Sequence, residues 1–269
     1  MTQTTDTGRA EDTDGMEAEF DVVANWTREA VQRLGPAHAI PAGCRGSASP
    51  AALAWLGEAC ELAEGSTLVD VGGGIGGPAA FAARRFGVRP IVVEPMLGAG
   101  RAAQALFGLS SLAADGTRLP LASGSVDAAW CLGVLCTTTE KETVIAEVRR
   151  VLRPGASLGL LVFVAAMPHP PGAPDGNEFP TTDRVVELLE AAGFEVVEQA
   201  DVADFAAGPR SWSERADRVD QAIEQAHADD PRFAVAQDQQ QRIAHLLDTA
   251  QITGKLVHAR VNEPGPGSR

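Results

Sequence analysis

A glycine-rich turn between an apolar run and a helical segment constrains this chain more than any other feature. Residues 68–78 read Leu-Val-Asp-Val-Gly-Gly-Gly-Ile-Gly-Gly-Pro. The apolar run is typical of a buried strand, the glycines allow a tight turn, and Pro78 suits the first turn of a helix. A strand that enters a helix through such a turn begins a βαβ unit, so the sequence predicts an α/β fold with a parallel sheet.

The same alternation continues along the chain. We expect strands over residues 67–71, 90–94, 110–114, 125–132, 157–165, 194–199 and 252–261. We expect helices over residues 20–34, 50–65, 78–86, 97–107, 139–152 and 183–192, with residues 39–49 as a linker between the first two. Two more amphipathic helices, over 213–228 and 231–250, interrupt the repeat before the last strand. Their position favours a lid over the ligand-binding edge of the sheet.

Composition excludes several classes of protein. The net charge of −14 would repel phosphate backbones and anionic lipids, so we expect neither nucleic acid nor a membrane as partner. Residues 1–19 lack the apolar segment of a secretory signal, and the four cysteines include no C-x-x-C pair. We therefore expect a cytoplasmic protein without a metal site. Abundant alanine, and many arginines beside only two lysines, suggest a high-GC bacterium and a role in its secondary metabolism.

The glycine turn is compatible with two kinds of cofactor. Gly72, Gly74 and Gly77 match the G-x-G-x-x-G pattern of dinucleotide sites. Asp70 separates the alternatives, because dinucleotide sites keep an apolar residue there and a carboxylate would repel a diphosphate. An acidic side chain beside glycine backbone suits a ligand with an ammonium group and a sulfonium. Glu94 ends the second strand 22 positions after Gly72, where a carboxylate can bind both ribose hydroxyls in either kind of site.

Two later segments carry a specific resemblance. Residues 114–130 read Ala-Asp-Gly-Thr-Arg-Leu-Pro-Leu-Ala-Ser-Gly-Ser-Val-Asp-Ala-Ala-Trp, and residues 151–158 read Val-Leu-Arg-Pro-Gly-Ala-Ser-Leu. With the glycine turn before them, they resemble in order the motifs of class I S-adenosylmethionine-dependent methyltransferases of the small-molecule, Methyltransferase-11-like branch. The resemblance is strong over residues 68–165 and only architectural in the flanks. It implies a Rossmann-like, doubly wound sheet of seven strands with an antiparallel last strand, N-terminal helices and a helical cap.

The resemblance also implies which residues bind the donor and its product, S-adenosylhomocysteine. Asp115 is expected to accept a hydrogen bond from the adenine amino group, and Arg45 to pair with the carboxylate of the methionine end. The residues expected at the cofactor are Asp70, Gly72, Gly73, Gly74, Glu94, Pro95, Met96, Asp115, Gly116, Leu132, Gly133 and Arg45. Gly73 departs from the family pattern, which has a different small residue there. Asp127 begins a strand at the opposite edge of the sheet, so we interpret it as structural.

The acceptor side offers fewer signals. Methyl transfer needs no protein nucleophile, and a general base matters only when the acceptor is a neutral hydroxyl. His169, just after the fifth strand, is the candidate base, with an exposed loop histidine as the alternative interpretation. The aromatic residues expected to cover an apolar acceptor are Trp26, Phe179, Phe205 and Trp212.

The expected organisation is a disordered tail (1–19), N-terminal helices that cover the cofactor site (20–65), the methyltransferase core (66–200), the lid (201–250), a closing strand (251–262) and a second tail (263–269). The predicted function is methyl transfer to a small metabolite or natural product by in-line displacement. Two alternatives stay open: a cofactor-binding member of the fold that does not methylate, such as a sensor or cyclase, and a nicotinamide-dependent oxidoreductase. The sequence leaves open the acceptor, the atom methylated (oxygen, nitrogen, carbon or sulfur), the use of a base, and whether the chain is a monomer or a homodimer.

Overall fold

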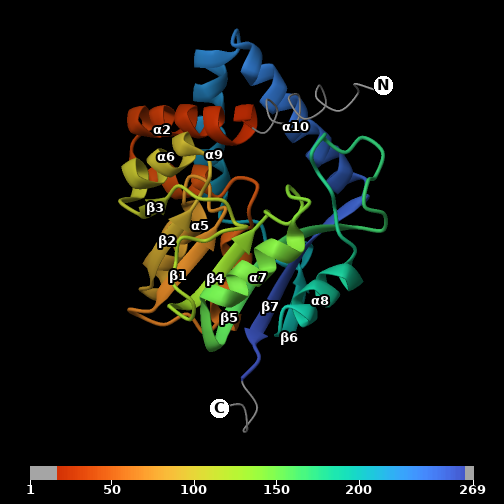
Figure 1. Ribbon diagram of the computed structural model, residues 1–269. Helices are drawn as coiled ribbons and strands as arrows, with labels where there is room; N and C mark the ends of the chain where they lie inside the picture. Colours follow the sequence, from red (N-terminus) through yellow and green to blue (C-terminus); the bar gives the residue numbers. More distant parts are fainter. Residues whose placement is uncertain (1–16, 264–269) are drawn as a thin grey trace, which may run out of the picture.

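The fold is built on a mixed sheet of seven strands. The computed structural model describes residues 17–263 (Figure 1). The strand order is β3-β2-β1-β4-β5-β7-β6, and β7 runs antiparallel to both of its neighbours. The strands are β1 (Thr67–Val71), β2 (Arg89–Val93), β3 (Ser110–Leu112), β4 (Val126–Leu132), β5 (Leu152–Ala165), β6 (Phe194–Asp201) and β7 (Ile252–Val261). This order confirms the expected Rossmann-like, doubly wound architecture with an antiparallel last strand.

Helices precede, connect and follow these strands. The α-helices are α2 (Val23–Leu34), α3 (Ala39–Gly43), α4 (Pro50–Ala59), α5 (Gly77–Phe86), α6 (Leu97–Phe107), α7 (Lys141–Val151), α8 (Thr182–Ala191), α9 (Arg210–His227) and α10 (Pro231–Asp248). A π-helix η1 (Glu17–Val22) and two 3-10 turns, η2 (Pro36–His38) and η3 (Val202–Asp204), complete the set described. Within residues 17–263, no helix is both long enough and apolar enough to cross a membrane.

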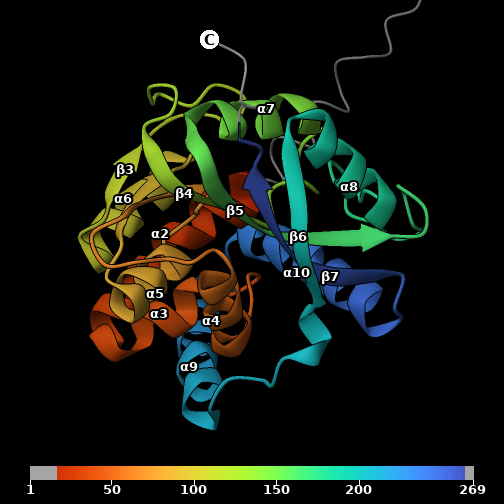
Figure 2. The ribbon, with the colours of Figure 1, turned by 90° about the horizontal axis from the view of Figure 1, so that it is seen from below.

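The alternation of side chains along the strands divides the core between the two faces of the sheet. In β5, Leu158 and Leu160 pack with α7 and α8, whereas Leu161 packs with α4 and α5. Figure 2 shows α4 and α5 on one side of the sheet and α7 and α8 on the other. Because helices cover both faces, a ligand can approach the sheet only at the ends of its strands.

The N-terminal region differs from its expected boundaries. Residues 39–49 were expected to be a linker, but they begin with helix α3, whose Ala39, Ile40 and Ala42 are buried. The next helix ends at Ala59 and does not reach residue 65. Of the expected first tail, residues 17–19 belong to η1, while residues 1–16 lie outside the described residues, as do residues 264–269 of the second tail.

β5 also differs, because it begins five residues earlier than expected. Leu152, expected to end a helix, pairs with Val126 of β4, so β5 follows α7 without a connecting loop. The apolar periodicity of a helix and the alternation of a strand overlap at this residue, and the pairing with β4 decides between them.

Helices α9 and α10 lie between β6 and β7 and pack against the N-terminal helices. α9 contacts α2 and α3, and α10 contacts η1 and β7. On α9, Val219 and Ile223 are buried against Trp26 of α2. On α10, Leu246 is buried, whereas Leu247 is 39% exposed. Both helices therefore add a layer to the N-terminal helices (Figure 1).

Asp127 joins strands at the edge of the sheet opposite the glycine turn. Its Oδ2 accepts a hydrogen bond from the Thr67 backbone N–H at 2.8 Å, and its other oxygen forms an ion pair with Arg153. These contacts connect the beginning of β4 to β1 and β5. They agree with the structural role predicted for this residue.

We expect Asp127→Ala to lower the free energy of unfolding by about 1 to 2 kcal/mol, because it removes one hydrogen bond to a charged acceptor and one partly exposed ion pair. Denaturant unfolding measures this loss. Asp127→Asn, which keeps an acceptor for the Thr67 N–H, is the matched control and should lose less. A fall in cofactor affinity without a change in stability would contradict the structural role.

Candidate cofactor site

The glycine turn after β1 depends on left-handed backbone. Gly72, Gly74 and Gly76 have φ values of 65°, 54° and 80°, a region that other residues rarely adopt. The Gly72 N–H donates to the Val93 carbonyl at 2.7 Å and so ties the turn to the end of β2. A Cβ on Gly72 would also lie 2.4 Å from Val134 Cγ2. Only glycine fits here, and the turn presents bare backbone at the carboxyl end of β1.

Asp70 lies directly before this turn and is almost completely buried. Its side chain is 1% exposed, and neither carboxylate oxygen has a hydrogen-bond partner within residues 17–263. Gly73 provides the space for it, because a Cβ on Gly73 would lie 2.8 Å from Asp70 Oδ2. The departure from the family pattern at Gly73 therefore accommodates this carboxylate.

Burial gives Asp70 an unusual protonation equilibrium. Desolvation, with a further contribution from the negative charge of Glu94, raises the pKa of Asp70 to about 7. A buried acid without a partner opposes folding, so it marks a place where a ligand can supply the partner. The ammonium group of S-adenosylmethionine is a partner of the right charge and hydrogen-bonding capacity, so these residues fit that cofactor.

Glu94 provides a second buried carboxylate at the end of the neighbouring strand β2. It is 6% exposed, and it accepts hydrogen bonds from the backbone N–H groups of Gly74 at 2.8 Å and Met96 at 2.9 Å. Burial raises the pKa of Glu94, while these two bonds act in the opposite direction. Each oxygen keeps a second lone pair, so the fixed carboxylate can still accept a bond from a ribose hydroxyl. The exposed Pro95 follows it and leads into α6.

The other expected cofactor residues lie at the same edge of the sheet. Exposed Asp115 follows β3, and its Oδ1 accepts from the Thr117 N–H at 2.7 Å. Gly116 lies against the end of β1, since a Cβ there would be 3.2 Å from Val71 Cγ1. Gly133, with φ 82°, follows half-buried Leu132 at the end of β4. Because β1 to β4 are parallel neighbours, their carboxyl ends bring these residues to the edge that carries Asp70.

Two glycines bring the N-terminal segment onto the turn, a contact that the sequence analysis missed. A Cβ on Gly77 would lie 2.1 Å from the Gly43 carbonyl carbon, and one on Gly43 would lie 2.9 Å from Gly77 Cα. The next residue, Cys44, is buried, and burial together with the negative charge of Asp70 raises the pKa of its thiol. No local pattern marks Gly43, because its importance arises only from the backbone that it meets.

Protein groups bind the Arg45 guanidinium in this structure, and its expected pairing with the cofactor carboxylate stays a prediction. Nε donates to the Ala42 carbonyl at 3.0 Å, Nη2 donates to Thr27 Oγ1 at 2.8 Å, and Nη1 forms an ion pair with Asp220 of α9. Arg45 therefore connects the segment after α3 to α2 and to α9. The carboxylate that it binds lies 175 positions away in the sequence.

Two of the four aromatic residues expected over the acceptor are core residues. Phe179 is 0% exposed and packs against Leu246 and Ile252, so it lines no open pocket. Trp26 is 6% exposed and stacks on His227 with ring centroids 4.4 Å apart. Both side chains lie in the core, because α9, α10 and β7 fill the space around these rings.

The other two aromatic residues stay candidates for the acceptor side. Phe205 and Trp212 are half-buried at the start of the lid. Phe205 lies 5.7 Å from Trp55, and Trp212 lies edge-on to Phe81 at 6.5 Å, measured between ring centroids. These pairs place apolar rings of the lid against α4 and α5.

His169 is exposed on the loop after β5, as the alternative interpretation of this residue proposed. A hollow of about 460 Å³ opens at the same end of β5, but His169 does not line it; its walls include Val164, Met167, Thr181, Gln251 and Thr253. Within residues 17–263, no group of three or more His, Cys, Asp or Glu side chains is arranged to hold a metal ion.

Comparison with known proteins agrees with this geometry. Residues 69–160 match a protein-family model described as a methyltransferase domain. O-methyltransferase resE of Aspergillus sclerotiorum is 29% identical over 164 residues, which cover 55% of this chain and 62% of that protein. Methyltransferase GfsG of Streptomyces halstedii is 28% identical over 166 residues, which cover 55% of this chain and 60% of that protein. The chain thus spans about three fifths of the length of these relatives.

Solved structures share the fold at lower identity. The [4+2]-cyclase SpnF superposes with a TM-score of 0.62 and 24% identity over 79% of this chain and 80% of that one. Phosphoethanolamine N-methyltransferase 2 of Haemonchus contortus, in complex with S-adenosylmethionine, superposes with a TM-score of 0.61 and 17% identity over 79% of this chain and 52% of that one. Residues 69–160 are thus similar to methyltransferase domains in sequence, and the chain shares the fold of these solved structures. S-adenosylmethionine is the cofactor of that family.

We expect the affinity for S-adenosylmethionine to fall as the pH is lowered below about 7. The ammonium group needs an ionised Asp70, and the pKa of this acid without ligand is about 7, so protons compete with the cofactor. Kd should rise by up to about tenfold for each pH unit below that value. Calorimetric titration between about pH 5.5 and 8.5 measures this dependence.

Asp70→Asn is the control, because it keeps the shape and cannot ionise. It should bind more weakly at pH 8 and lose most of the pH dependence. Since the folded pKa of Asp70 lies above its usual 3.8, the ionised form destabilises the ligand-free protein as the pH rises through about 7. Asp70→Asn should therefore raise Tm at pH 8 without ligand. Equal pH dependence in both proteins would contradict the assignment.

Proposed function

We propose that the chain binds S-adenosylmethionine at the carboxyl ends of β1 to β4 and transfers its methyl group to a small-molecule acceptor. The observation that carries this proposal is the buried Asp70 carboxylate, which has no hydrogen-bond partner among the described residues, beside the bare backbone of the turn and one strand away from Glu94. When bound, the cofactor supplies a methyl group on a cationic sulfur, which an acceptor atom displaces in line.

Each group at the edge has one part in holding the donor. Asp70 accepts hydrogen bonds from its ammonium group, and Glu94 accepts them from its ribose hydroxyls. Asp115 accepts a hydrogen bond from the adenine amino group. Gly43, seated on Gly77, holds the N-terminal segment over the methionine end, where it excludes water and keeps the sulfur aligned.

The acceptor lies on the side covered by the lid. Half-buried Phe205 and Trp212, with Trp55 and Phe81 opposite, offer apolar surface, which favours a small acceptor with an apolar body. Relatives from Aspergillus sclerotiorum and Pyrenophora dematioidea are named O-methyltransferases, which supports oxygen as the accepting atom. Acceleration comes mainly from alignment, and a base matters only when the acceptor is a neutral hydroxyl.

A second candidate function is cofactor binding without methyl transfer. The fold is shared with the [4+2]-cyclase SpnF over 79% of this chain. A protein of that kind would carry the same acidic and glycine residues at the cofactor, so these residues do not separate the two functions. Incubation with methyl-labelled donor and a metabolite extract does: a labelled small molecule heavier by one methylene supports transfer, and tight donor binding without any such product supports the second candidate.

We expect Asp70→Ala and Glu94→Ala each to weaken S-adenosylmethionine binding by at least about 1 to 3 kcal/mol, the cost of losing a charge-assisted hydrogen bond. Calorimetric titration at pH 8 measures the loss, and NADH serves as the competing ligand for the oxidoreductase alternative. Asp127→Ala is the control, because it removes an acid of the same sheet at the opposite edge. Near-native affinity in both folded variants would reject the cofactor assignment.

We expect Phe205→Ser and Trp212→Ser each to leave the Kd of the donor within about threefold of wild type. Each should lower kcat/KM for the acceptor by about tenfold or more. The reason is that these rings belong to the lid and not to the turn. Val235→Ser, at an exposed position of α10, is the matched control. If donor affinity falls as steeply as turnover while the fold survives, the lid belongs to the cofactor site.

A further inference from the structure

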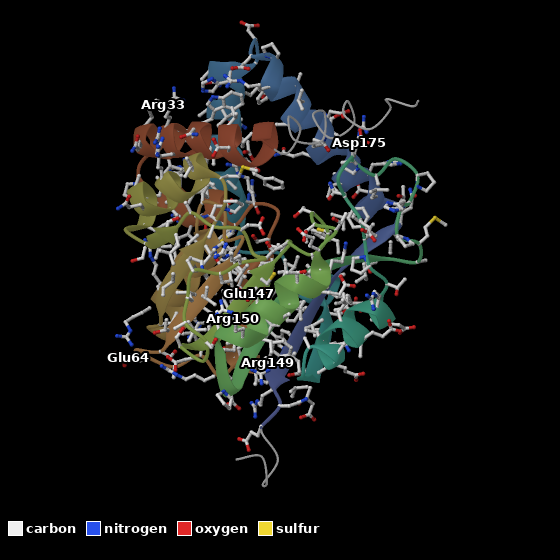
Figure 3. The ribbon with its side chains drawn as sticks, viewed as in Figure 1. Arg33, Glu64, Glu147, Arg149, Arg150 and Asp175 are labelled. Carbon is white, nitrogen blue, oxygen red and sulfur yellow. The ribbon has the colours of Figure 1, made fainter. Side chains whose placement is uncertain are left out.

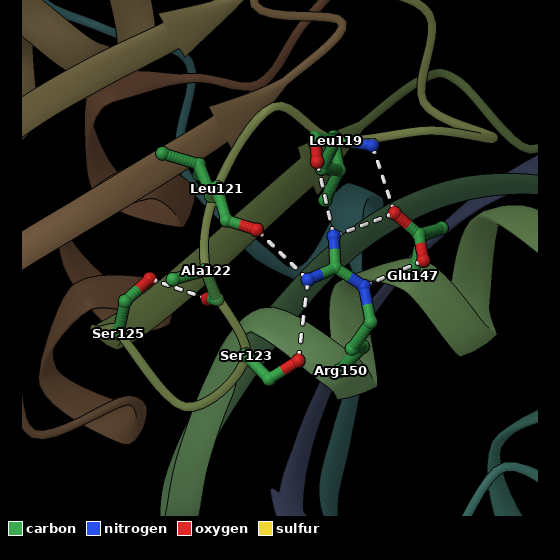
Figure 4. A network of polar contacts seen from close by, with 7 residues as sticks. All are labelled: Leu119, Leu121, Ala122, Ser123, Ser125, Glu147 and Arg150. Carbon is green, nitrogen blue, oxygen red and sulfur yellow. Dashed lines mark hydrogen bonds and ion pairs between the residues drawn. The ribbon is translucent and has the colours of Figure 1, made fainter.

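A network of polar contacts fixes the loop between β3 and β4 to helix α7. Arg150 donates from Nη2 to the Leu119 carbonyl at 3.0 Å and from Nη1 to the Leu121 carbonyl at 2.8 Å (Figure 4). A longer contact of 3.4 Å joins Nη1 to Ser123 Oγ. Glu147 accepts the Leu119 N–H at 2.9 Å. One arginine and one glutamate thus bind both the carbonyl and the amide of Leu119.

The two charged side chains also bind each other. Arg150 Nε lies 2.7 Å from Glu147 Oε1, and Nη2 lies 2.8 Å from Glu147 Oε2, which is a two-point contact between planar groups. Hydrogen bonding from Arg150 lowers the pKa of Glu147, so the carboxylate stays ionised at neutral pH. We call this pair the α7 clamp. It is rigid because each group holds the other in the geometry that the loop requires.

The clamp is one of several contacts that position the loop between β3 and β4. Residues 113–125 contain no helix or strand, and β3 before them is three residues long at the edge of the sheet. Leu119 is 3% exposed and anchors the loop in the core, where Ala114 and Leu121 also pack. The clamp adds directional bonds to the N–H and carbonyl of Leu119 and to the carbonyl of Leu121, and these bonds orient the backbone around the anchor.

Asp115 is connected to the clamp through a single tight turn. Its Oδ1 accepts from the Thr117 N–H at 2.7 Å, and its carbonyl accepts from the Arg118 N–H at 3.1 Å. Residues 115–118 therefore form one unit that is closed by its own hydrogen bonds. The next residue, Leu119, is the one that the clamp holds, so a shift of Leu119 carries the carboxylate of Asp115 with it.

We propose that Glu147 and Arg150 are positioning residues that set the place of Asp115 and thereby the selectivity of the site for an adenine base. The proposal rests on the proposed function, because it assigns Asp115 to the amino group of the donor's adenine. Neither side chain touches the base. They act through Leu119 and the turn before it, and they hold the carboxylate where a base with an amino donor fits and a base with a carbonyl in its place does not.

Selectivity for the base is measured as the ratio of two dissociation constants. The probes are S-adenosylhomocysteine and S-inosylhomocysteine, in which a carbonyl replaces the amino group. Wild type should favour the adenine compound. Arg150→Gln and Glu147→Gln should each lower the ratio by about tenfold. Arg150→Lys should recover only part of it, since an ammonium cannot reproduce the planar fork that binds two carbonyls and a carboxylate.

Arg149→Gln is the matched control. Arg149 lies on the same helix as Arg150 and carries the same charge, but its Nε is directed toward Gly193, the residue before β6. Figure 3 shows Arg149 apart from the pair formed by Glu147 and Arg150. This variant should keep the wild-type ratio.

A double-variant test separates positioning from general support of the fold. Asp115→Ala should abolish the selectivity, and adding Arg150→Gln to it should not change the ratio further. A clamp that only stabilises the fold would lower Tm and weaken both ligands equally, with the ratio unchanged, and that result would overturn the proposal. If Arg150→Gln does not fold, Glu147→Gln and Arg150→Lys decide by the same ratio.

The outcome for wild type distinguishes this proposal from the proposed function. Folded wild type that binds neither compound rejects the cofactor site itself, and the clamp with it. Wild type that binds both compounds equally keeps the cofactor site and rejects the role of Asp115 and its clamp. If wild type and the Arg150→Gln variant are equally selective for the adenine compound, the positioning role of the clamp is rejected and the role of Asp115 stands.

Discussion

The carboxylate of Asp70 is the constraint on which the donor side of this fold depends. Asp70 sits in the register of β1 between Val92 and Trp130, where a sheet covered on both faces would ordinarily hold an apolar side chain. Its oxygens are buried and have no hydrogen-bond partner in the described part of the chain, so the group opposes folding. Gly73 leaves the space that the carboxylate needs, and the turn around it leaves the backbone bare. A costly group surrounded by residues that accommodate it is the pattern of a binding site, since stability alone would favour its replacement.

The cover over this edge is made of segments that are far apart in the sequence. Gly43 seats α3 directly on the first residue of α5, and Arg45 joins the segment after α3 to Asp220 on α9. The donor side and the lid are therefore connected by one short stretch of chain, residues 43–45.

The sequence predicted those features of the fold that residues close together in the chain determine. Alternating strands and helices, the left-handed glycines and the buried acid before them are local features, and the sheet order and the position of Asp70 agree with them. The sequence did not show the contacts of residues whose partners are remote. Arg45 looks available in the sequence because Asp220 is 175 positions away. Phe179 looks like a pocket residue because nothing near it shows that α10 and β7 will enclose it. The sequence did not reveal the α7 clamp, because a glutamate and an arginine three residues apart on a helix are ordinary surface partners. Only the structure shows that both side chains also bind the backbone of the loop before β4.

This difference explains why the donor is easier to identify than the acceptor. The donor side is formed where parallel neighbouring strands end, so four short motifs specify it and strand pairing brings them together. In the function that we propose, the acceptor side is formed by residues 201–250 and by loops, whose positions depend on packing between helices with no fixed register. A change in the lid can alter the acceptor while leaving β1 and its turn intact. Local sequence therefore suffices to identify the donor site, whereas the proposed acceptor side depends on tertiary contacts such as those of Phe205 with Trp55.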